Sequence, residues 1–168
     1  TAPANPRVVI KTSEGDITAH LFADKSPATV ANFLAYVDSG FYNGTLFHRV
    51  IPEFMIQGGG LGPDMKEKET RAPVVNESDN RLHNIRGTLA MARTNDPDSA
   101  TSQFFINQRS NLRLDWAAGR EGYTVFGEVI QGMDIVDFIT TAPTGQVGKM
   151  GDVPLQAIVI KEILRQQP

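Results

Sequence analysis

The sequence contains no cysteine among its 168 residues. Disulfide bonds, thiol nucleophiles and cysteine-ligated metal centres are therefore excluded. The three histidines, His20, His48 and His83, are isolated, and none of them belongs to an H-x-x-x-H pair or to another spacing that would hold a metal. We expect each to be a structural or surface residue.

Long apolar runs and basic clusters are also missing. The longest uninterrupted apolar stretches, such as residues 157–160, span only a few residues, whereas a membrane helix needs about 20. With 16 basic and 19 acidic residues the net charge is −3, and no basic run marks a nucleic-acid site. We therefore expect neither a membrane nor a nucleic acid as a partner, and we expect a monomer.

The chain begins with "TAPANP" and has no initiator methionine. We expect residues 1–6 to be a flexible N-terminal lead-in and residues 7–168 to form a single domain, because no repeat or linker divides them. Such a start fits either a mature chain after removal of a signal peptide or a trimmed chain. The expected compartment is the periplasm, with the cytoplasm as the alternative.

Short segments of strand character alternate with turn residues along most of the chain. We expect strands at residues 8–11, 16–22, 46–51, 54–57, 88–92, 103–107, 124–130 and 157–164. Residues 61–84 are polar and irregular, and we expect a long surface loop there. Many short strands with two helices far apart predict a mainly β fold, a closed antiparallel barrel with helices at its ends. A β-sandwich is the alternative.

The first helix has clear boundaries. Ser26 suits the N-cap, Pro27 suits the first helical position and Gly40 suits the end. The apolar residues between them follow the i, i+3, i+4, i+7 pattern, so one face is expected to be buried: Val30, Phe33, Leu34 and Val37. A second, short helix is expected at residues 133–140.

Covalent and nucleotide-binding motifs are lacking. There is no G-x-S-x-G nucleophile motif. The glycines of residues 58–62 have neither the dinucleotide-binding nor the P-loop spacing, and no helix start follows them. We expect a tight turn or a close backbone crossing there.

The stretch "FHRVIPEFMIQGGG", residues 47–60, places a charged residue among apolar ones. Alternation puts Phe47, Arg49 and Ile51 on one face of a strand and His48 and Val50 on the other. A guanidinium cannot lose its charge, and burying it unpaired is costly. The side chain of Arg49 therefore requires a polar or charged group to face.

Two interpretations of the neighbouring apolar residues remain open. The large side chains can simply fill the barrel: Phe54, Met55, Phe104, Phe105 and Leu114. However, Arg49, Gln57 and Gln103 are interleaved with them. An apolar cleft with a few directed polar groups is the usual composition of a ligand site.

Three motifs give the chain a family resemblance. They are "FHRVIPEFMIQGGG", "RGTLAMARTNDPDSATSQFFIN" at residues 86–107 and "YTVFGEVIQGMDIVDFI" at residues 123–139. Together they resemble the cyclophilins, which are peptidyl-prolyl cis–trans isomerases, and "GGGLGPDMKEKET" resembles the bacterial branch. The resemblance covers nearly the whole chain.

The resemblance implies a closed eight-stranded antiparallel barrel capped by two α-helices. It implies rotation about X–Pro peptide bonds of unfolded or flexible client proteins, which assists folding without a cofactor or metal. Arg49 would be catalytic. Phe54, Met55, Phe105 and Leu114 would form the proline pocket, and Gln57, Ala92 and Arg93 would hold the peptide backbone. Tyr123 stands where many members have histidine.

Two other classes of function are compatible with parts of the sequence. A binding module could use the same groove to hold proline-containing segments without turnover, but such a module would not need Arg49. A metal-dependent hydrolase is disfavoured by the missing ligand sets.

One position departs from the family pattern. Members that bind cyclosporin tightly carry a tryptophan shortly after the F-F-I motif, and an ungapped count places Arg113 there. Trp116 would be the equivalent only if the loop shifts. An arginine lacks the apolar face and the indole donor of tryptophan, so we expect weak cyclosporin binding.

Overall fold

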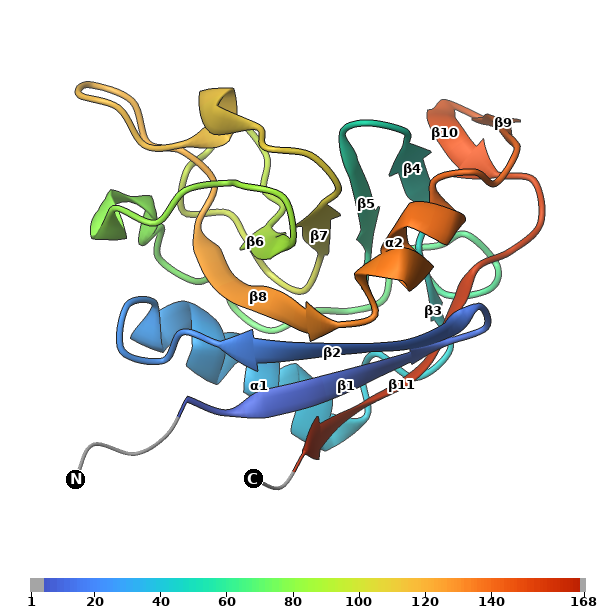
Figure 1. Cartoon of the computed structure of the whole chain (residues 1–168), viewed down its shortest axis with the longest axis horizontal. Coiled ribbons are helices and arrows are strands. Elements are labelled where there is room, and N and C mark those ends of the chain that lie inside the picture. Colours follow the sequence, from blue (N-terminus) through green and yellow to red (C-terminus); the bar gives the residue numbers. More distant parts are fainter. Residues whose placement is uncertain (1–4, 167–168) are drawn as a thin grey trace.

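A curled antiparallel sheet and two helices form the computed structural model, which describes residues 5–166 (Figure 1). Residues 1–4 of the expected lead-in lie outside the described residues, and β1 begins at Arg7. The strands are β1 (Arg7–Thr12), β2 (Gly15–Leu21), β3 (Thr45–Leu46), β4 (Arg49–Ile51), β5 (Met55–Gly58), β6 (Thr88–Met91), β7 (Phe104–Asn107), β8 (Val125–Gln131), β9 (Thr144–Val147), β10 (Met150–Pro154) and β11 (Val159–Gln166). The helices are α1 (Pro27–Ser39) and α2 (Met133–Ile139), with 3-10 turns η1 (Ser78–Asn80) and η2 (Leu112–Leu114).

Nine strands form one sheet in the order β3-β11-β1-β2-β8-β6-β7-β5-β4. Its two edge strands, β3 and β4, are separated in the chain by only Phe47 and His48, so the sheet curls until its edges meet. Among the described residues no ladder joins these edges; single backbone bonds link β3 to the end of β5 and the segment after it, from Leu46 N–H to the Leu61 carbonyl at 3.0 Å and from Gly59 N–H to the Leu46 carbonyl at 3.4 Å. The expected mainly β fold with two helices is confirmed, and the closed eight-stranded barrel describes it approximately.

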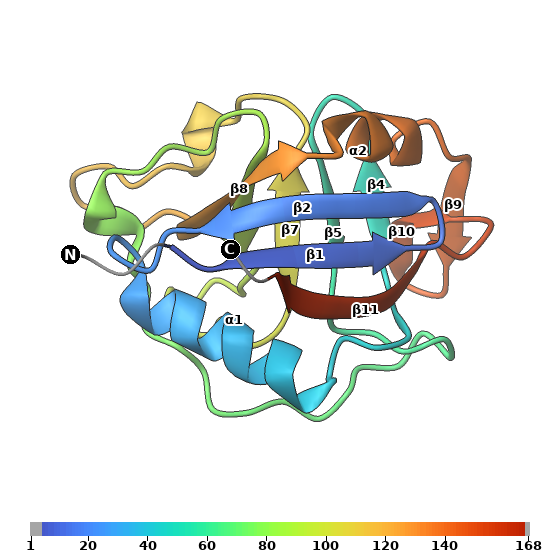
Figure 2. The ribbon, with the colours of Figure 1, turned by 60° about the horizontal axis from the view of Figure 1, so that its bottom comes forward.

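The helices lie on opposite sides of the curled sheet (Figure 2). Helix α1 buries its predicted apolar face and ends at Gly40, whose φ of 74° is left-handed, as expected for a C-terminal glycine. Helix α2 also lies where the sequence predicts it.

Ser26 is the N-cap residue of α1, as predicted, but its side chain makes no capping bond. Its hydroxyl donates to the Val125 carbonyl at 2.7 Å. Instead, the carboxylate of Glu77 accepts from the N–H groups of Ala28 and Thr29, at 3.3 and 2.7 Å. A residue of the long loop therefore caps the helix.

Aromatic rings fill the space between α1 and the sheet. Phe33 packs against Tyr42, Phe104 and Phe126 with ring centroids 5.0–5.5 Å apart. Phe104 is fully buried in this main core. Phe47 joins it as well, so the expectation that Phe47 shares a face with Arg49 is wrong. The cause is the break between β3 and β4, which interrupts the strict alternation.

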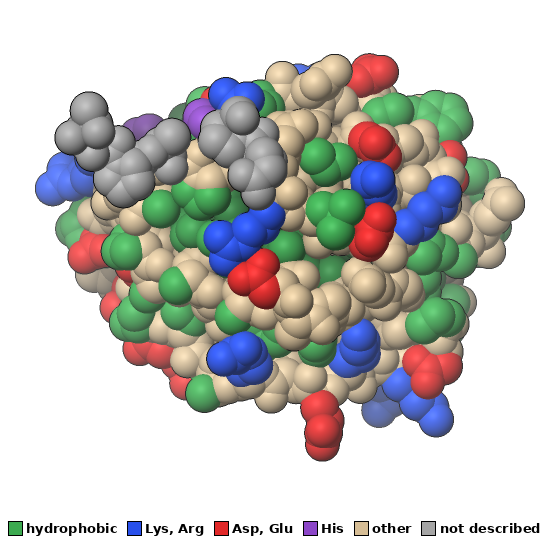
Figure 3. All heavy atoms as spheres, turned by 90° about the horizontal axis from the view of Figure 1, so that it is seen from below, with side chains coloured by type: hydrophobic (Ala, Val, Ile, Leu, Met, Phe, Trp, Pro, Cys, Tyr) green, Lys and Arg blue, Asp and Glu red, His purple; other side chains and the backbone are tan. Residues whose placement is uncertain are grey.

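Residues between β5 and β6 form the expected long irregular segment, with η1 as its regular turn. The β9–β10 hairpin was not predicted. On the side of the molecule where β1, β11 and α1 lie, basic and acidic side chains are interspersed with apolar ones (Figure 3). No helix in the described part of the chain is long and apolar enough to cross a bilayer.

Candidate active site

Three of the predicted site residues lie in one row on the outer face of four neighbouring strands. Strand register pairs Arg49 with Gln57, Gln57 with Phe105, and Phe105 with Ala90. Residues directly opposite one another on antiparallel strands project from the same face. The row therefore crosses β4, β5, β7 and β6 in that order, from Arg49 at one end to Ala90 at the other.

An apolar cluster lies along this row, separate from the main core, and we call it the proline pocket after its expected role. Met55 and Phe105 are 2% and 4% exposed, although they face outward, because other side chains pack over them. The predicted pocket residues do come together here: Phe54, Met55, Ala92, Phe105, Leu114 and Tyr123. The ring of Tyr123 meets Phe105 edge-on at 5.7 Å.

Hydrogen bonds link three polar side chains beside the pocket, namely Arg49, Gln57 and Gln103. An Nη1 hydrogen of Arg49 is donated to Gln57 Oε1 over 3.4 Å, and Gln57 Nε2 donates to Gln103 Oε1 at 3.0 Å. Arg49 is half-buried, and none of the ion pairs among residues 5–166 involves it. A guanidinium has five N–H donors, and among the described residues only one of those of Arg49 has a hydrogen-bond partner, Gln57.

The glycines of residues 58–60 permit close packing, as the sequence predicted. A Cβ at Gly58 would come within 2.5 Å of the Leu46 carbonyl oxygen, at the junction of the sheet edges. A Cβ at Gly60 would come within 2.3 Å of Gln103 Cγ. Gly60 thus leaves the space through which Gln103 reaches Gln57.

The side chain of Arg93 is committed to its own chain. It donates to the carbonyls of Thr94, Glu121 and Gly122 at 2.8–3.2 Å, and its guanidinium lies 4.5 Å from the Tyr123 ring centroid. Of the proposed backbone-holding residues, Arg93 would therefore contact a peptide through its main chain, while its side chain fixes Tyr123.

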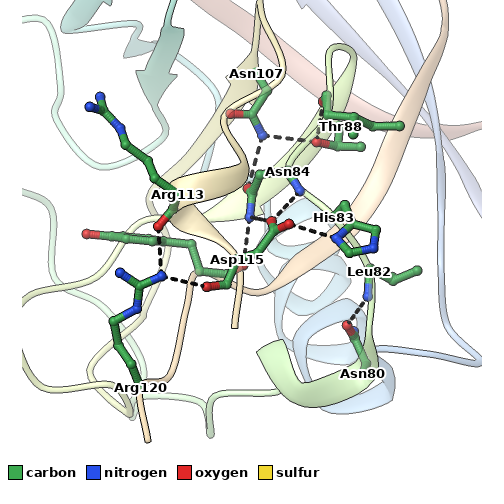
Figure 4. A network of polar contacts seen from close by, with 11 residues as sticks. Asn80, Leu82, His83, Asn84, Thr88, Asn107, Arg113, Asp115 and Arg120 are labelled. Carbon is green, nitrogen blue, oxygen red and sulfur yellow. Dashed lines mark hydrogen bonds and ion pairs between the residues drawn. The ribbon is translucent and has the colours of Figure 1, made fainter. Parts of the chain in front are cut away.

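A buried asparagine network behind the pocket was not predicted (Figure 4). Asn107 donates to Asn84 Oδ1 at 3.1 Å and to Thr88 Oγ1 at 3.0 Å. Asn111 donates to Asn107 Oδ1 at 2.8 Å and to the carbonyl of Phe54 at 3.0 Å. Asn84 and Asn107 are fully buried, and a satisfied buried network makes its surroundings rigid.

Asp115 anchors the same network to η2. One carboxylate oxygen accepts from the backbone and side-chain nitrogens of Asn84 at 2.7 and 3.0 Å, and the other lies 2.7 Å from His83 Nδ1 (Figure 4). Asn84 also donates to the Tyr123 carbonyl at 3.4 Å. The network therefore holds Phe54, Leu114 and Tyr123, which come from three separate segments, around one pocket.

Arg113, and not Trp116, borders the pocket. The guanidinium carbon of Arg113 lies 5.2 Å from the ring centroid of Phe54. Trp116 lies near Arg81 instead, with the guanidinium carbon of Arg81 6.0 Å from its ring centroid. The geometry supports the ungapped count.

His48 is buried next to Arg49. Its side chain is only 8% exposed, and Nδ1 has no hydrogen-bond partner. Burial lowers the pKa of His48, the charge of Arg49 lowers it further, and the Leu46 backbone opposes this. His20 and His83 lie beside Glu128 and Asp115. Within the described residues no group of three or more potential ligands could hold a metal.

Comparisons with known proteins match this geometry. The model of the cyclophilin type peptidyl-prolyl cis-trans isomerase family matches residues 7–164. A peptidyl-prolyl cis-trans isomerase of Acinetobacter baylyi is 55% identical over 159 residues, covering 95% of this chain and 85% of the relative. Peptidyl-prolyl cis-trans isomerase B of Escherichia coli is 52% identical over 159 residues, covering 93% and 97%.

A solved structure agrees with these matches. The cyclophilin type isomerase of Cryptosporidium parvum superimposes with a TM-score of 0.84 at 31% identity, covering 98% of this chain and 99% of that one. The matched fold, the matched length and the high identity to bacterial isomerases point to one conclusion. The chain belongs to the cyclophilin family and is a peptidyl-prolyl cis–trans isomerase.

Proposed function

We propose that Arg49 is the catalytic residue of this isomerase. Rotation about an X–Pro bond must cross a barrier of roughly 18–20 kcal/mol, because resonance gives the C–N bond double-bond character. In the twisted state the lone pair returns to the prolyl nitrogen, which can then accept a hydrogen bond. A donor fixed at that point stabilises the twisted state more than the planar one, which is the condition for catalysis.

One observation supports this role above the others. Arg49 is a half-buried cation without a carboxylate partner in the described chain, at the edge of an apolar pocket. Apolar surroundings strengthen a charged hydrogen bond. No covalent bond forms or breaks during the rotation, so neither a nucleophile nor an acid–base pair is required.

The remaining site residues are proposed to bind the client. Phe54, Met55, Phe105 and Leu114 would enclose the proline ring. The peptide backbone would lie along Gln57, Ala92 and Arg93, with Tyr123 closing the pocket. A related structure from Cryptosporidium parvum was determined in the presence of the dipeptide Ala-Pro, which supports proline-containing peptides as ligands.

Replacement of Arg49 tests the mechanism. We expect Arg49→Ala to lower kcat/KM for a proline peptide by a factor of about 10² or more, the scale for losing one preorganised donor. Arg49→Lys should recover little, since an ammonium does not reproduce the planar fork. The measurement is a protease-coupled isomerisation assay, with Lys161→Ala on β11 as the charge-matched control.

The same assay separates an enzyme from a holding module. Near-normal turnover in Arg49→Ala, with the melting temperature unchanged, would refute the mechanism. A wild-type protein that binds proline peptides but does not speed their isomerisation would favour the holding module.

Several finer properties are proposed from the sequence. The clients are unfolded or flexible proteins, and the isomerase assists their folding as a monomer. Cyclosporin binding is weak, which the position of Arg113 over Phe54 supports, since a guanidinium occupies the place of the tryptophan. The proposed compartment is the periplasm, with the cytoplasm as the alternative.

A further inference from the structure

A groove beside the proline pocket is bordered by two arginines. It has a volume of about 330 Å³, and Phe54 forms one of its walls. Glu53, Arg109 and Arg113 contribute its charged side chains. Phe54 also belongs to the pocket, so a peptide whose proline entered the pocket would pass close to this groove.

The two arginines have no ionic partners in the described part of the chain. The ion pairs there involve other cations, namely Lys11, His20, His83, Arg86 and Arg165. The guanidinium of Arg113 extends away from Asp115 and Arg120, and no contact is drawn from it within the network (Figure 4).

The acidic residues around the groove do not neutralise it. The carboxylate of Asp115, two residues from Arg113, is occupied by Asn84 and His83. Asp137, which does not line the groove, is paired with Arg86. Glu53 is the one acid in the lining, against two arginines. Arg120 adds a further exposed cation, which donates to the carbonyl of Arg113 at 3.1 Å. The local charge is therefore positive on a chain whose net charge is −3.

We infer that Arg113, together with Arg109, forms a subsite that selects clients with an acidic side chain near the proline. This inference rests on the proposed function, because it requires the proline to occupy the pocket at Phe54. The carboxylate of a Glu or Asp residue would lie between the two guanidiniums, which bind carboxylates with directed pairs of N–H donors. Stacking of Arg113 over Phe54 holds its charge beside the pocket.

The local groove and the whole molecule predict opposite preferences. If the net charge of −3 governed binding, basic peptides would be favoured at low ionic strength. If the groove governs it, acidic peptides are favoured. Since exposed ion pairs are weak, we expect a modest effect, with kcat/KM about two- to fivefold higher for an acidic than for a neutral peptide.

The experiment compares proline peptides that differ by one charge. Glu, Gln or Lys is placed at the first or second residue on either side of an Ala-Pro core, and kcat/KM is measured at about 20 mM and about 500 mM salt. We expect the Glu peptide to exceed the Lys peptide on one flank at low salt. The difference should shrink at high salt, where the Debye length falls below about 5 Å.

Variants assign the effect to the groove. Arg113→Ala should bring the Glu-to-Lys ratio close to one, and Arg113→Glu should reverse it. Arg109→Ala should reduce it in part. Lys161→Ala changes the net charge by the same amount on exposed β11 and should leave the ratio unchanged. Melting temperatures verify that each variant folds.

Failure of this inference is distinguishable from failure of the proposed function. Turnover of the Gln peptides with no Glu-to-Lys difference on either flank, or a difference that survives in Arg113→Ala, would overturn the subsite while leaving the isomerase mechanism intact. Loss of the dependence on Arg49 for the Gln peptides would instead overturn the mechanism.

Discussion

The titration of His48 couples pH to the stability of the fold. Its pKa in the folded protein is lowered from the ordinary 6.5, first by burial and then by the charge of Arg49. The unfolded chain therefore binds more protons than the folded one as pH falls below about 6.5, so the free energy of unfolding decreases in that range. Above this window both states carry a neutral imidazole, and the contribution is constant.

Urea unfolding at pH 7.5 and pH 5.5 measures this contribution. We expect the wild type to lose more stability on acidification than His48→Gln, which has no titrating ring. His20→Gln serves as the control, since His20 is a partly exposed residue beside Glu128. Two carboxylates have a pKa lowered from the ordinary 3.8, Asp38 and Asp137, so their titration lies below this window and does not contribute to the difference between pH 7.5 and pH 5.5. Equal losses in wild type and His48→Gln would contradict the assignment.

At the residue scale, the site residues that could be predicted from the sequence are those that lie close together in the chain. Arg49, Met55 and Gln57 fall in one motif, and strand pairing places them on one face. The asparagine network could not be foreseen, because Asn84 and Asn107 meet only after β6 and β7 pair and the loops fold over them. Buried amides follow no sequence period. Only the side-chain chemistry of "FFIN", an amide ending an apolar strand, hinted at it.

At the scale of elements, Glu77 completes the start of α1. The first turn of this helix contains no acidic residue, and the side chain of Ser26 makes no capping bond. Glu77 supplies both functions, because its carboxylate accepts from two N–H groups and from the Thr29 hydroxyl at 2.7 Å. We expect Glu77→Ala to lower the free energy of unfolding by about 1–2 kcal/mol, the upper range for loss of a helix cap with its charge.

Denaturant unfolding of a small set of variants checks this value. Glu77→Gln keeps an acceptor without the charge and should cost less than Glu77→Ala. Glu14→Ala, in the exposed β1–β2 turn, removes a carboxylate away from any helix start and should be nearly neutral. A cost for Glu77→Ala no greater than that for Glu14→Ala would show that the cap does not stabilise α1.

The elements themselves were predictable where local signals were strong. Pro27, Gly40 and a regular apolar face define α1, and the structure agrees. The split between β3 and β4 was not predicted, because the apolar run of residues 46–51 reads as one strand. The β9–β10 hairpin was missed because its strands contain glycine and polar residues and form a separate two-stranded sheet.

At the scale of the whole molecule, curling of the sheet creates the site. The outer faces of β4, β5, β7 and β6 carry the row from Arg49 to Ala90, while their inner faces carry Ile56 and Ile106 in the core. The number of strands and the order of their pairing depend on contacts between distant segments, so composition and periodicity indicated a barrel without fixing either. The family resemblance supplied what local patterns could not.

The proposed mechanism predicts a flat dependence of turnover on pH. Prolyl rotation transfers no proton, and a guanidinium keeps its charge throughout the range from about pH 6 to 8. The nearest titrating ring, His48, has a lowered pKa and so is mostly neutral at pH 7 and above. We expect kcat/KM to vary less than about twofold across this range. We also expect chelators to leave kcat/KM unchanged, since no set of ligands that could hold a metal occurs within residues 5–166.

A fall in kcat/KM near pH 6–7 that disappears in His48→Gln would instead show that protonation beside Arg49 weakens its hydrogen bond to the client. Because stability in this window also responds to His48, the assay is run well below the melting temperature, so that a loss of rate reports the chemistry and not unfolding.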